Sequence, residues 1–262
     1  MLILVALAVA GPLVSPSEAA RLLGEGARVL DARGAFAYMT EGHIPGAPRV
    51  NWKDATTGGL FSGKLGDPAR VAQFYAQNGV DQSRPVLVVG AWDKGWGEEG
   101  RLWWDLTYLG HDDVYVLRGG MQKWTGEKEL MPATAPLGQF QPEPNEAMRA
   151  TMESLYDPGG ILLDVREPEE FAGARKYGEA RGGHIPGALN RPWTTFLGIA
   201  IVRGPQTPIA PDPETPITVY CTGGVRAAMV ALMLTDEGYT AVRNYDGSFW
   251  EWSDSGKDVS VK

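Results

Sequence analysis

The side chain of Cys221, the single cysteine of the 262-residue chain, is the one whose type and setting point most directly to chemistry. Two adjacent glycines after it let the backbone adopt positive φ and direct several N–H groups toward one point. A following helix N-terminus and the fixed cation of Arg226 add positive charge. A thiol in such surroundings titrates at roughly 3.5–7.5 instead of about 8.5. The sequence therefore predicts a nucleophilic Cys221 with a binding loop made of Thr222, Gly223, Gly224, Val225 and Arg226.

The alternative for Cys221 is a small buried apolar side chain, which is a common environment for a free cysteine. The residue follows a β-branched apolar run at 217–220, typical of a buried strand, and precedes a helical segment that starts near Val225 and ends at Gly238. The carboxyl ends of parallel strands are where open α/β sheets bind ligands. This position favours the nucleophile.

The spacing of the loop distinguishes two chemistries. Phosphatase loops of the tyrosine-phosphatase type place five residues between cysteine and arginine, whereas four separate Cys221 from Arg226. A tighter ring of N–H groups suits a smaller anion, such as one additional sulfur atom on the cysteine. Attack of the thiolate on a sulfane sulfur gives a persulfide, which a second nucleophile then removes.

An internal repeat organises the chain. The motif GHIPGA occurs at 42–47 and again at 183–188. Similar strands, helices and glycine–tryptophan endings follow each copy in the same order, which indicates a duplicated domain. Because short apolar runs alternate with helical segments, each copy is expected to form an α/β domain with a mainly parallel sheet.

Composition sets the limits of the domains. Four prolines between 132 and 144 mark a linker. We expect an apolar N-terminal segment at 1–12, a first domain at 13–134, a linker at 135–148 and a second domain at 149–262. The apolar segment fits either a buried first strand or the remnant of an export signal, so an exported and a cytoplasmic location both stay open.

Charge and cysteine count exclude several classes of protein. A net charge of −8 disfavours nucleic acid, which needs a basic surface. One cysteine excludes an internal disulfide and a thiolate-bound metal, and three histidines leave little for another metal site. We expect no metal, no cofactor and no membrane span.

Four motifs together resemble the tandem rhodaneses, which are two-domain thiosulfate or 3-mercaptopyruvate sulfurtransferases: CTGGVR, both copies of GHIPGA, DVREPEEF at 164–171 and YDGSFWEW at 245–252. The resemblance covers the chain from about residue 13. It implies two rhodanese-like domains, a persulfide on Cys221 in the C-terminal domain and a pocket lined partly by an inactive N-terminal domain. The partners it implies are a small anionic sulfur donor and a thiophilic acceptor.

The first copy lacks the thiol. Aligning the strands places Gly90 opposite Cys221, and Arg101 follows Gly90 by eleven residues, so the loop is six residues longer. We therefore expect a packing role for this domain, with Trp92 and Trp96 as candidates for the pocket wall. A polar insert at 174–181 is either a surface loop or a lip over the pocket.

Other polar residues receive structural roles. Asp164 is expected to cap a helix, pair with an arginine or orient the cysteine loop, and Arg166 to form a surface salt bridge or help bind the donor. The histidines of the GHIPGA turns are expected to bond nearby carbonyls or carboxylates, and the acids at 167–170 to form a solvated helix start. Two functions besides sulfur transfer stay open: a non-catalytic sulfur carrier or regulatory module, and a dual-specificity-type phosphatase.

Overall fold

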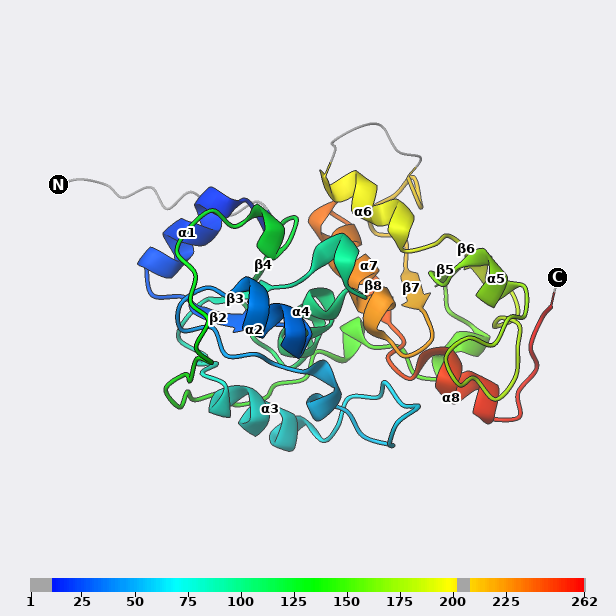
Figure 1. Ribbon diagram of the computed structural model, residues 1–262. Helices are drawn as coiled ribbons and strands as arrows, with labels where there is room; N and C mark the ends of the chain where they lie inside the picture. The colour runs from blue at the N-terminus through cyan, green and yellow to red at the C-terminus, as the bar shows by residue number, and fades with distance from the viewer. Residues whose placement is uncertain (1–10, 202–207, 262) are drawn as a thin grey trace.

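The computed structural model describes residues 11–201 and 208–261 (Figure 1). The described chain forms two sheets of four strands, in the orders β1-β4-β3-β2 and β6-β5-β7-β8. Every pairing in both sheets is parallel. This confirms the predicted duplicated α/β fold. The apolar segment at 1–10 lies outside the described residues, and no helix among those described is long and apolar enough to cross a membrane.

The strands are short and strongly apolar, as expected for strands covered on both faces. The apolar run at 217–220 forms a strand with those bounds, and all four of its residues are buried, as are the four of the corresponding strand at 86–89. The first sheet comprises β1 (Leu13–Val14), β2 (Arg28–Asp31), β3 (Val86–Val89) and β4 (Val114–Leu117). The second comprises β5 (Ile161–Asp164), β6 (Leu189–Asn190), β7 (Ile217–Tyr220) and β8 (Val242–Asn244).

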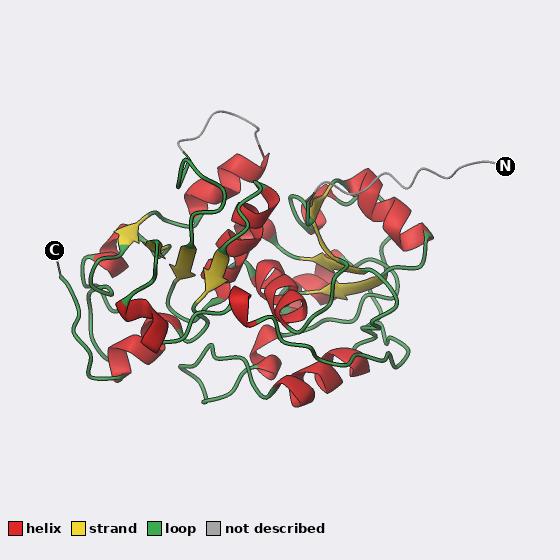
Figure 2. Ribbon diagram, turned by 180° about the vertical axis from the view of Figure 1, so that it is seen from behind, coloured by secondary structure: helices red, strands yellow, loops and turns green. Residues whose placement is uncertain are grey.

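Helices pack on both sheets (Figure 2), and short turns of 3-10 helix occur in the segments between helices and strands. The first domain holds α1 (Pro16–Gly24), α2 (Ala35–Glu41), α3 (Pro68–Gln77), α4 (Glu98–Tyr108), η1 (Trp52–Ala55), η2 (Trp92–Lys94) and η3 (Met121–Lys123). The rest of the chain holds η4 (Glu146–Met148), η5 (Glu153–Tyr156), α5 (Pro168–Phe171), α6 (Thr194–Ile201), α7 (Val225–Asp236) and α8 (Ser248–Asp254).

Isolated bridges complete the equivalence of the two sheets. In the second domain Arg149 bridges Asn244 in parallel, which is the place that β1 takes beside β4 in the first domain. In the first domain Asp31 bridges Arg49 in parallel, which corresponds to the pairing of β5 with β6. The two domains therefore share one topology and differ in how regularly their edges are formed.

The domains meet through α4 and α7, which lie side by side at the centre of the molecule (Figure 1). A Cβ on Gly100 would lie 2.4 Å from the Cα of Met229, so the glycine permits the two helices to pack backbone against backbone. Buried side chains of both helices belong to one hydrophobic cluster that spans the two domains. Burial of apolar surface thus fixes the geometry between the domains.

Each domain contains the same buried salt bridge behind its GHIPGA turn. Arg33 Nη2 donates to Asp31 at 2.7 Å and to the Gly42 carbonyl at 2.7 Å. In the second domain, Arg166 Nη2 donates to Asp164 at 2.6 Å and to the Gly183 carbonyl at 2.8 Å. The arginine therefore ties the end of β2 in the first domain, and the end of β5 in the second, to the start of the turn. An aspartate and an arginine two residues apart thus accompany the turn motif in both domains.

Candidate active site

Cys221 directly follows β7 and lies four residues before Val225, the first residue of α7. The Gly224 N–H donates to its Sγ at 3.2 Å, and Gly224 itself adopts φ 77° as the helix cap. The sulfur thus accepts a hydrogen bond from the loop that the sequence predicted. The residue is 1% exposed, but it lines a cavity. Burial here places the thiol at the floor of a pocket.

Ser248 holds the other side of the cysteine. Its Oγ accepts the Cys221 N–H at 3.1 Å and donates to the Tyr245 carbonyl at 2.7 Å. Ser248 adopts φ 52°, a left-handed conformation that is unfavourable for a residue with a side chain. Its counterpart in the first domain is Gly120, with φ 67°. Sequence reasoning missed this residue, although the replacement of glycine by serine in the second repeat was a signal.

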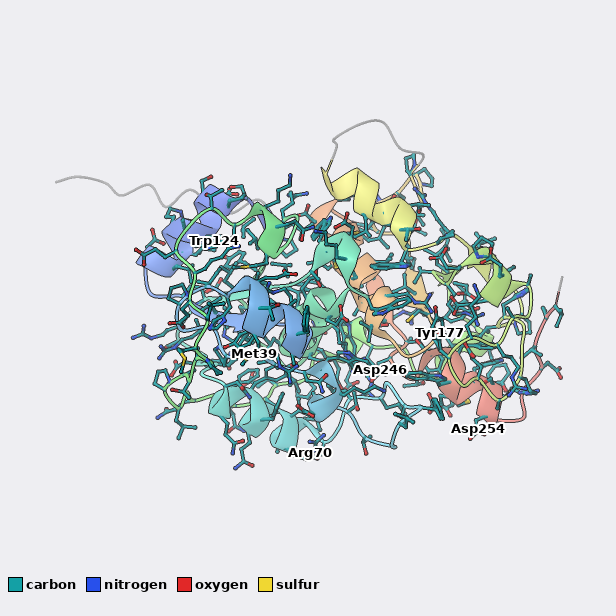
Figure 3. The ribbon with its side chains drawn as sticks, viewed as in Figure 1. Met39, Arg70, Trp124, Tyr177, Asp246 and Asp254 are labelled. Atoms are coloured by element: carbon teal, nitrogen blue, oxygen red, sulfur yellow. The ribbon has the colours of Figure 1, made fainter. Side chains whose placement is uncertain are left out.

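The cavity above Cys221 has a volume of about 160 Å³ and aromatic walls from both domains. Trp52 and Trp96 come from the first domain, and Tyr177 and Trp250 from the second. Tyr177, labelled in Figure 3, lies in the polar insert at 174–181 and lines the cavity, which favours the second of the two alternatives for this insert, a lip over the pocket. Trp96 forms part of the wall as expected, whereas Trp92 is completely buried in the hydrophobic core and does not line the cavity.

Arg226 lines the cavity with its guanidinium already paired. Its Nη1 donates to Glu170 Oε2 at 2.7 Å and its Nη2 to Glu170 Oε1 at 2.9 Å. Nη2 also donates to Thr222 Oγ1 at 2.6 Å. Burial alone would raise the pKa of Glu170, but its hydrogen bonds and attraction to Arg226 lower the pKa below its ordinary value. The pair is therefore a buried, charge-compensated clamp on the cysteine loop.

The prediction of a solvated helix start at 167–170 is wrong for Glu170, which is 0% exposed. Glu169 and Glu170 are adjacent, but only Glu170 points toward the cysteine loop, and Glu169 pairs with Lys176 at the surface. Helical geometry turns consecutive side chains to different faces. A run of acids in the sequence does not show which member faces the core.

Asp164 and Arg166 do not line the cavity. Both side chains are completely buried and bonded to each other, so the expected salt bridge is present but lies inside the domain and not at its surface. The ring of Phe249 packs 4.0 Å from the Arg166 guanidinium carbon. His184 Nδ1 lies 2.9 Å from the Phe171 carbonyl, which agrees with the structural role expected for this histidine.

A segment of the first domain closes over the cysteine loop. A Cβ on Gly63 would lie 1.9 Å from the Gly223 carbonyl oxygen, so the two backbones touch. Asp246 accepts the Leu65 N–H at 2.7 Å and pairs with Arg149 at 2.8 Å. Figure 3 shows Asp246 between the two domains. The cavity is thus a product of both domains.

The corresponding connection in the first domain is filled by a carboxyl group. Glu99 Oε1 accepts the Trp92 N–H at 2.8 Å, and a Cβ on Gly90 would lie 2.1 Å from the Glu99 carboxyl carbon. The helix cap Gly97, with φ 83°, matches Gly224, so Glu99 and not Arg101 corresponds to Arg226. Gly97 follows Gly90 by seven residues and Gly224 follows Cys221 by three, which makes the first connection four residues longer and not six.

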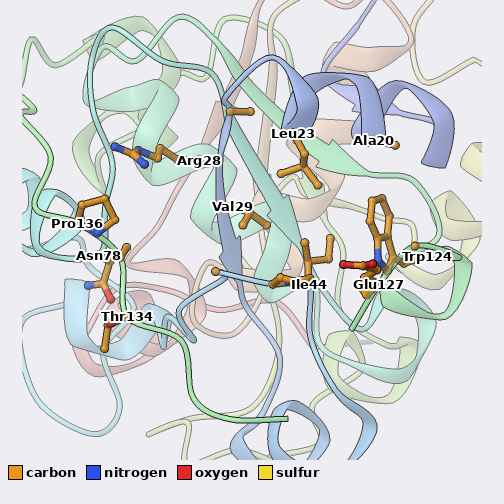
Figure 4. A pocket seen from close by; sticks show the side chains of 15 residues that line it. Ala20, Leu23, Arg28, Val29, Ile44, Asn78, Trp124, Glu127, Thr134 and Pro136 are labelled. Carbon is orange, nitrogen blue, oxygen red and sulfur yellow. The ribbon is translucent and has the colours of Figure 1, made fainter. Parts of the chain in front are cut away.

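Two other features of the described residues, the candidate metal ligands and a second pocket, point to no catalytic group. Within 11–201 and 208–261, no group of three or more histidine, cysteine or acidic side chains could hold a metal ion. A larger pocket of about 540 Å³ in the first domain lies against β2 and α1 (Figure 4). Its wall combines Leu23, Val29, Ile44 and Trp124 with the polar Arg28 and Glu127, and it contains no thiol.

Comparison with known proteins agrees with the geometry. The protein-family model described as the rhodanese-like domain matches the sequence twice, at residues 15–127 and 146–255. A thiosulfate sulfurtransferase of Corynebacterium glutamicum is 32% identical over 260 residues, covering 89% of this chain and 84% of that protein. The sulfur carrier protein TtuD of Thermus thermophilus is 29% identical, covering 86% and 87%. The crystal structure of SseA, the 3-mercaptopyruvate enzyme of Escherichia coli, superposes with a TM-score of 0.75 at 26% identity, covering 91% and 98%.

Two parallel α/β domains, with one thiol loop at the carboxyl end of a strand, define a two-domain enzyme of the sulfurtransferase class. The chain belongs to the rhodanese family.

Proposed function

We propose that the protein transfers a sulfur atom from a small anionic donor, the outer sulfur of thiosulfate or the thiol sulfur of 3-mercaptopyruvate, to cyanide or a thiol through a persulfide on Cys221. The observation that carries the proposal is the hydrogen bond from the Gly224 N–H to Sγ at the floor of a cavity lined by both domains. The names of the similar proteins support the same donor classes.

The reaction has two steps. In the first, the Cys221 thiolate attacks the outer sulfur of thiosulfate; the S–S bond of the donor breaks and its electron pair leaves with sulfite. With 3-mercaptopyruvate the C–S bond breaks instead, and its electron pair leaves with pyruvate as the enolate. In the second, cyanide attacks the outer sulfur of the persulfide; the new S–S bond breaks, thiocyanate departs and the thiolate returns. The loop residues Thr222 to Val225 surround the sulfur that is transferred, and Arg226 and Asp164 act through the shape of the loop and of its supporting strand.

The test is steady-state formation of thiocyanate, with thiosulfate and 3-mercaptopyruvate compared side by side. Cys221→Ser removes the nucleophile and is expected to abolish turnover with both donors. Retention of full activity by this variant contradicts the proposal. Hydrolysis of p-nitrophenyl phosphate is expected to be absent, because the loop is one residue shorter than a phosphatase loop.

A sulfur carrier is the second candidate, and the similarity to a protein named as a sulfur carrier favours keeping it. A carrier would gain the mass of one sulfur atom on Cys221 after incubation with thiosulfate but would not turn over with cyanide. Mass spectrometry of the intact protein, run beside the thiocyanate assay, separates the two functions.

A further inference from the structure

The charge of the cavity is unusual for a site that receives an anion. The cation that lines it, Arg226, is paired with Glu170 through two hydrogen bonds, and both side chains are buried. The other charged group of its described wall is the carboxylate of Glu98, which accepts the Trp96 N–H at 2.7 Å. An entering anion therefore meets a guanidinium whose charge is already offset.

Two further cations among the described residues lie near the cysteine loop or its aromatic wall, and each is engaged. Arg101 Nη1 lies 3.0 Å from where a Cβ on Gly224 would be, and its Nε donates to Asp105 Oδ1 at 2.7 Å. Lys53 Nζ donates to the carbonyls of Leu60 and Ser62 at 2.9 and 3.1 Å. It lies 4.5 Å from the ring centre of Trp52 and 4.6 Å from that of Trp250. Burial, followed by the charge of Arg101, lowers the pKa of Lys53. Lys53 thus supports two rings of the wall and does not itself line the cavity.

The walls favour an apolar body. Four aromatic rings surround the opening above Cys221, and the Arg226 guanidinium lies 5.7 Å from the Trp96 ring and 5.6 Å from the Tyr177 ring. Aromatic and apolar groups gain free energy when they pack on such rings. A doubly charged anion instead loses more hydration, and the cation of the described wall, Arg226, is already paired with a carboxylate.

We propose that Glu170 is a specificity-determining residue, which by neutralising Arg226 favours singly charged organic sulfur donors with an apolar body over the thiosulfate dianion. The proposal rests on the sulfur transfer proposed above and names the class of donor for the same site. A donor of the type R–SO₂–S⁻ has this chemistry. The Cys221 thiolate attacks the terminal sulfur, the S–S bond breaks, and the electron pair leaves with the sulfinate R–SO₂⁻, so no further reactant is needed.

Three donors separate charge from apolar contact: thiosulfate, methanethiosulfonate and benzenethiosulfonate. The first is doubly charged, and the other two are singly charged and differ in the size of the apolar group. With cyanide as acceptor, kcat/KM is expected to rise in that order for the unmodified protein. If thiosulfate has the highest kcat/KM of the three, the proposal is wrong.

Glu170→Gln keeps the shape of the side chain and releases the charge of Arg226. We expect kcat/KM to rise about tenfold for thiosulfate and about threefold for methanethiosulfonate, because the added attraction scales with the charge of the donor. The ratio of the two should therefore increase about threefold. The matched control is Glu169→Gln, which removes a charge from the same helix at an exposed position that contacts Lys176 and not Arg226. It should leave the ratio unchanged.

A second variant tests whether a change in folding, and not the charge of Arg226, causes the altered donor preference of Glu170→Gln. Glu170→Gln combined with Arg226→Gln leaves no unpaired buried charge, and it should lose the gain for thiosulfate seen with Glu170→Gln alone. Circular dichroism and thermal unfolding confirm that each variant is folded. An unchanged donor ratio in folded Glu170→Gln overturns the proposal.

A binding measurement distinguishes this proposal from the proposed function. In Cys221→Ser, thiosulfate binding can be followed by the fluorescence of the pocket tryptophans. Addition of Glu170→Gln is expected to tighten binding about tenfold, whether or not the intact protein turns over. Absence of turnover with all three donors contradicts the proposed function, whereas unchanged binding contradicts the role of Glu170.

Discussion

The connection between β3 and α4 and the connection between β7 and α7 have the same flanking elements. They differ in the group at the helix N-terminus, which is a carboxyl group in the first domain and a thiol in the second. Both follow a fully buried strand and both end at a glycine with positive φ that caps a helix. In the second domain, three residues after Cys221 bring an N–H to the sulfur. In the first, a longer loop leaves room for a carboxyl group from the helix itself. The length of the loop decides whether the helix N-terminus faces a cavity or its own side chain.

The comparison also shows what the first domain contributes without a thiol. Trp52 and Trp96 form half of the aromatic wall, and Gly63 contacts the backbone of the cysteine loop. The first domain, which has no thiol in its loop, is therefore still part of the pocket. The second domain supplies the sulfur of Cys221, and both domains supply the wall of the cavity around it.

The largest effect is expected where the domains are the same. Arg33→Met and Arg166→Met each leave a completely buried aspartate without its partner, which costs about 3–5 kcal/mol of unfolding free energy. Because the two salt bridges have matching geometry, the two losses should be similar. Urea denaturation followed by tryptophan fluorescence measures them. A loss below about 1 kcal/mol in either variant would mean that the shared salt bridge does not support that domain.

A smaller and pH-dependent effect is expected where the domains differ. Complete burial, together with the negative charge of Glu98, raises the pKa of Glu99 to about 7. Between its ordinary value of 4.5 and this value, the folded chain binds more protons than the unfolded chain. The stability contributed by neutral Glu99 is therefore complete below pH 4.5 and is lost as the pH rises to about 7.

Glu99→Gln removes this dependence. Relative to the unmodified protein, the variant should gain roughly 3 kcal/mol between pH 4 and pH 8, as its side chain carries no charge to bury. Urea denaturation at the two pH values measures the gain. Glu25→Gln, at an exposed carboxylate beyond α1, is the control and should show no such gain. An equal pH dependence in Glu99→Gln and the unmodified protein would contradict the burial of a titrating carboxyl in the first domain.

Sequence reasoning predicted the architecture well because the signals were local and repeated. The central strands, the helix from Val225 and the loop around Cys221 depend on short apolar runs and on glycines that the chain displays in order. The duplicated motif then supplied the relation between the domains. These features need no knowledge of distant contacts.

The rest of the site depends on contacts between residues far apart in the chain. Glu170 meets Arg226 across 56 residues, and Leu65 meets Asp246 across 181. No periodicity reveals which acid in a run turns inward or which tryptophan of the first domain reaches the second. Ser248 is predictable only in part. Comparison of the two repeats shows that a serine replaces a glycine there, but not that its Oγ accepts a hydrogen bond from the Cys221 N–H.

The smallest effect is expected at the rim between the domains. Lys64 pairs with Glu251 at 2.7 Å across the domain boundary, but the lysine side chain is 46% exposed. Exposed ion pairs contribute about 0–1 kcal/mol and weaken with salt, so Lys64→Ala should lower stability by less than about 1 kcal/mol and leave kcat/KM unchanged. Unfolding measured at low and high salt tests this, and the small difference should vanish at high salt. A larger loss would mean that the exposed ion pair stabilises the association of the domains. The expected result means that the apolar contact of α4 with α7 and the buried hydrogen bond from Leu65 to Asp246 stabilise it.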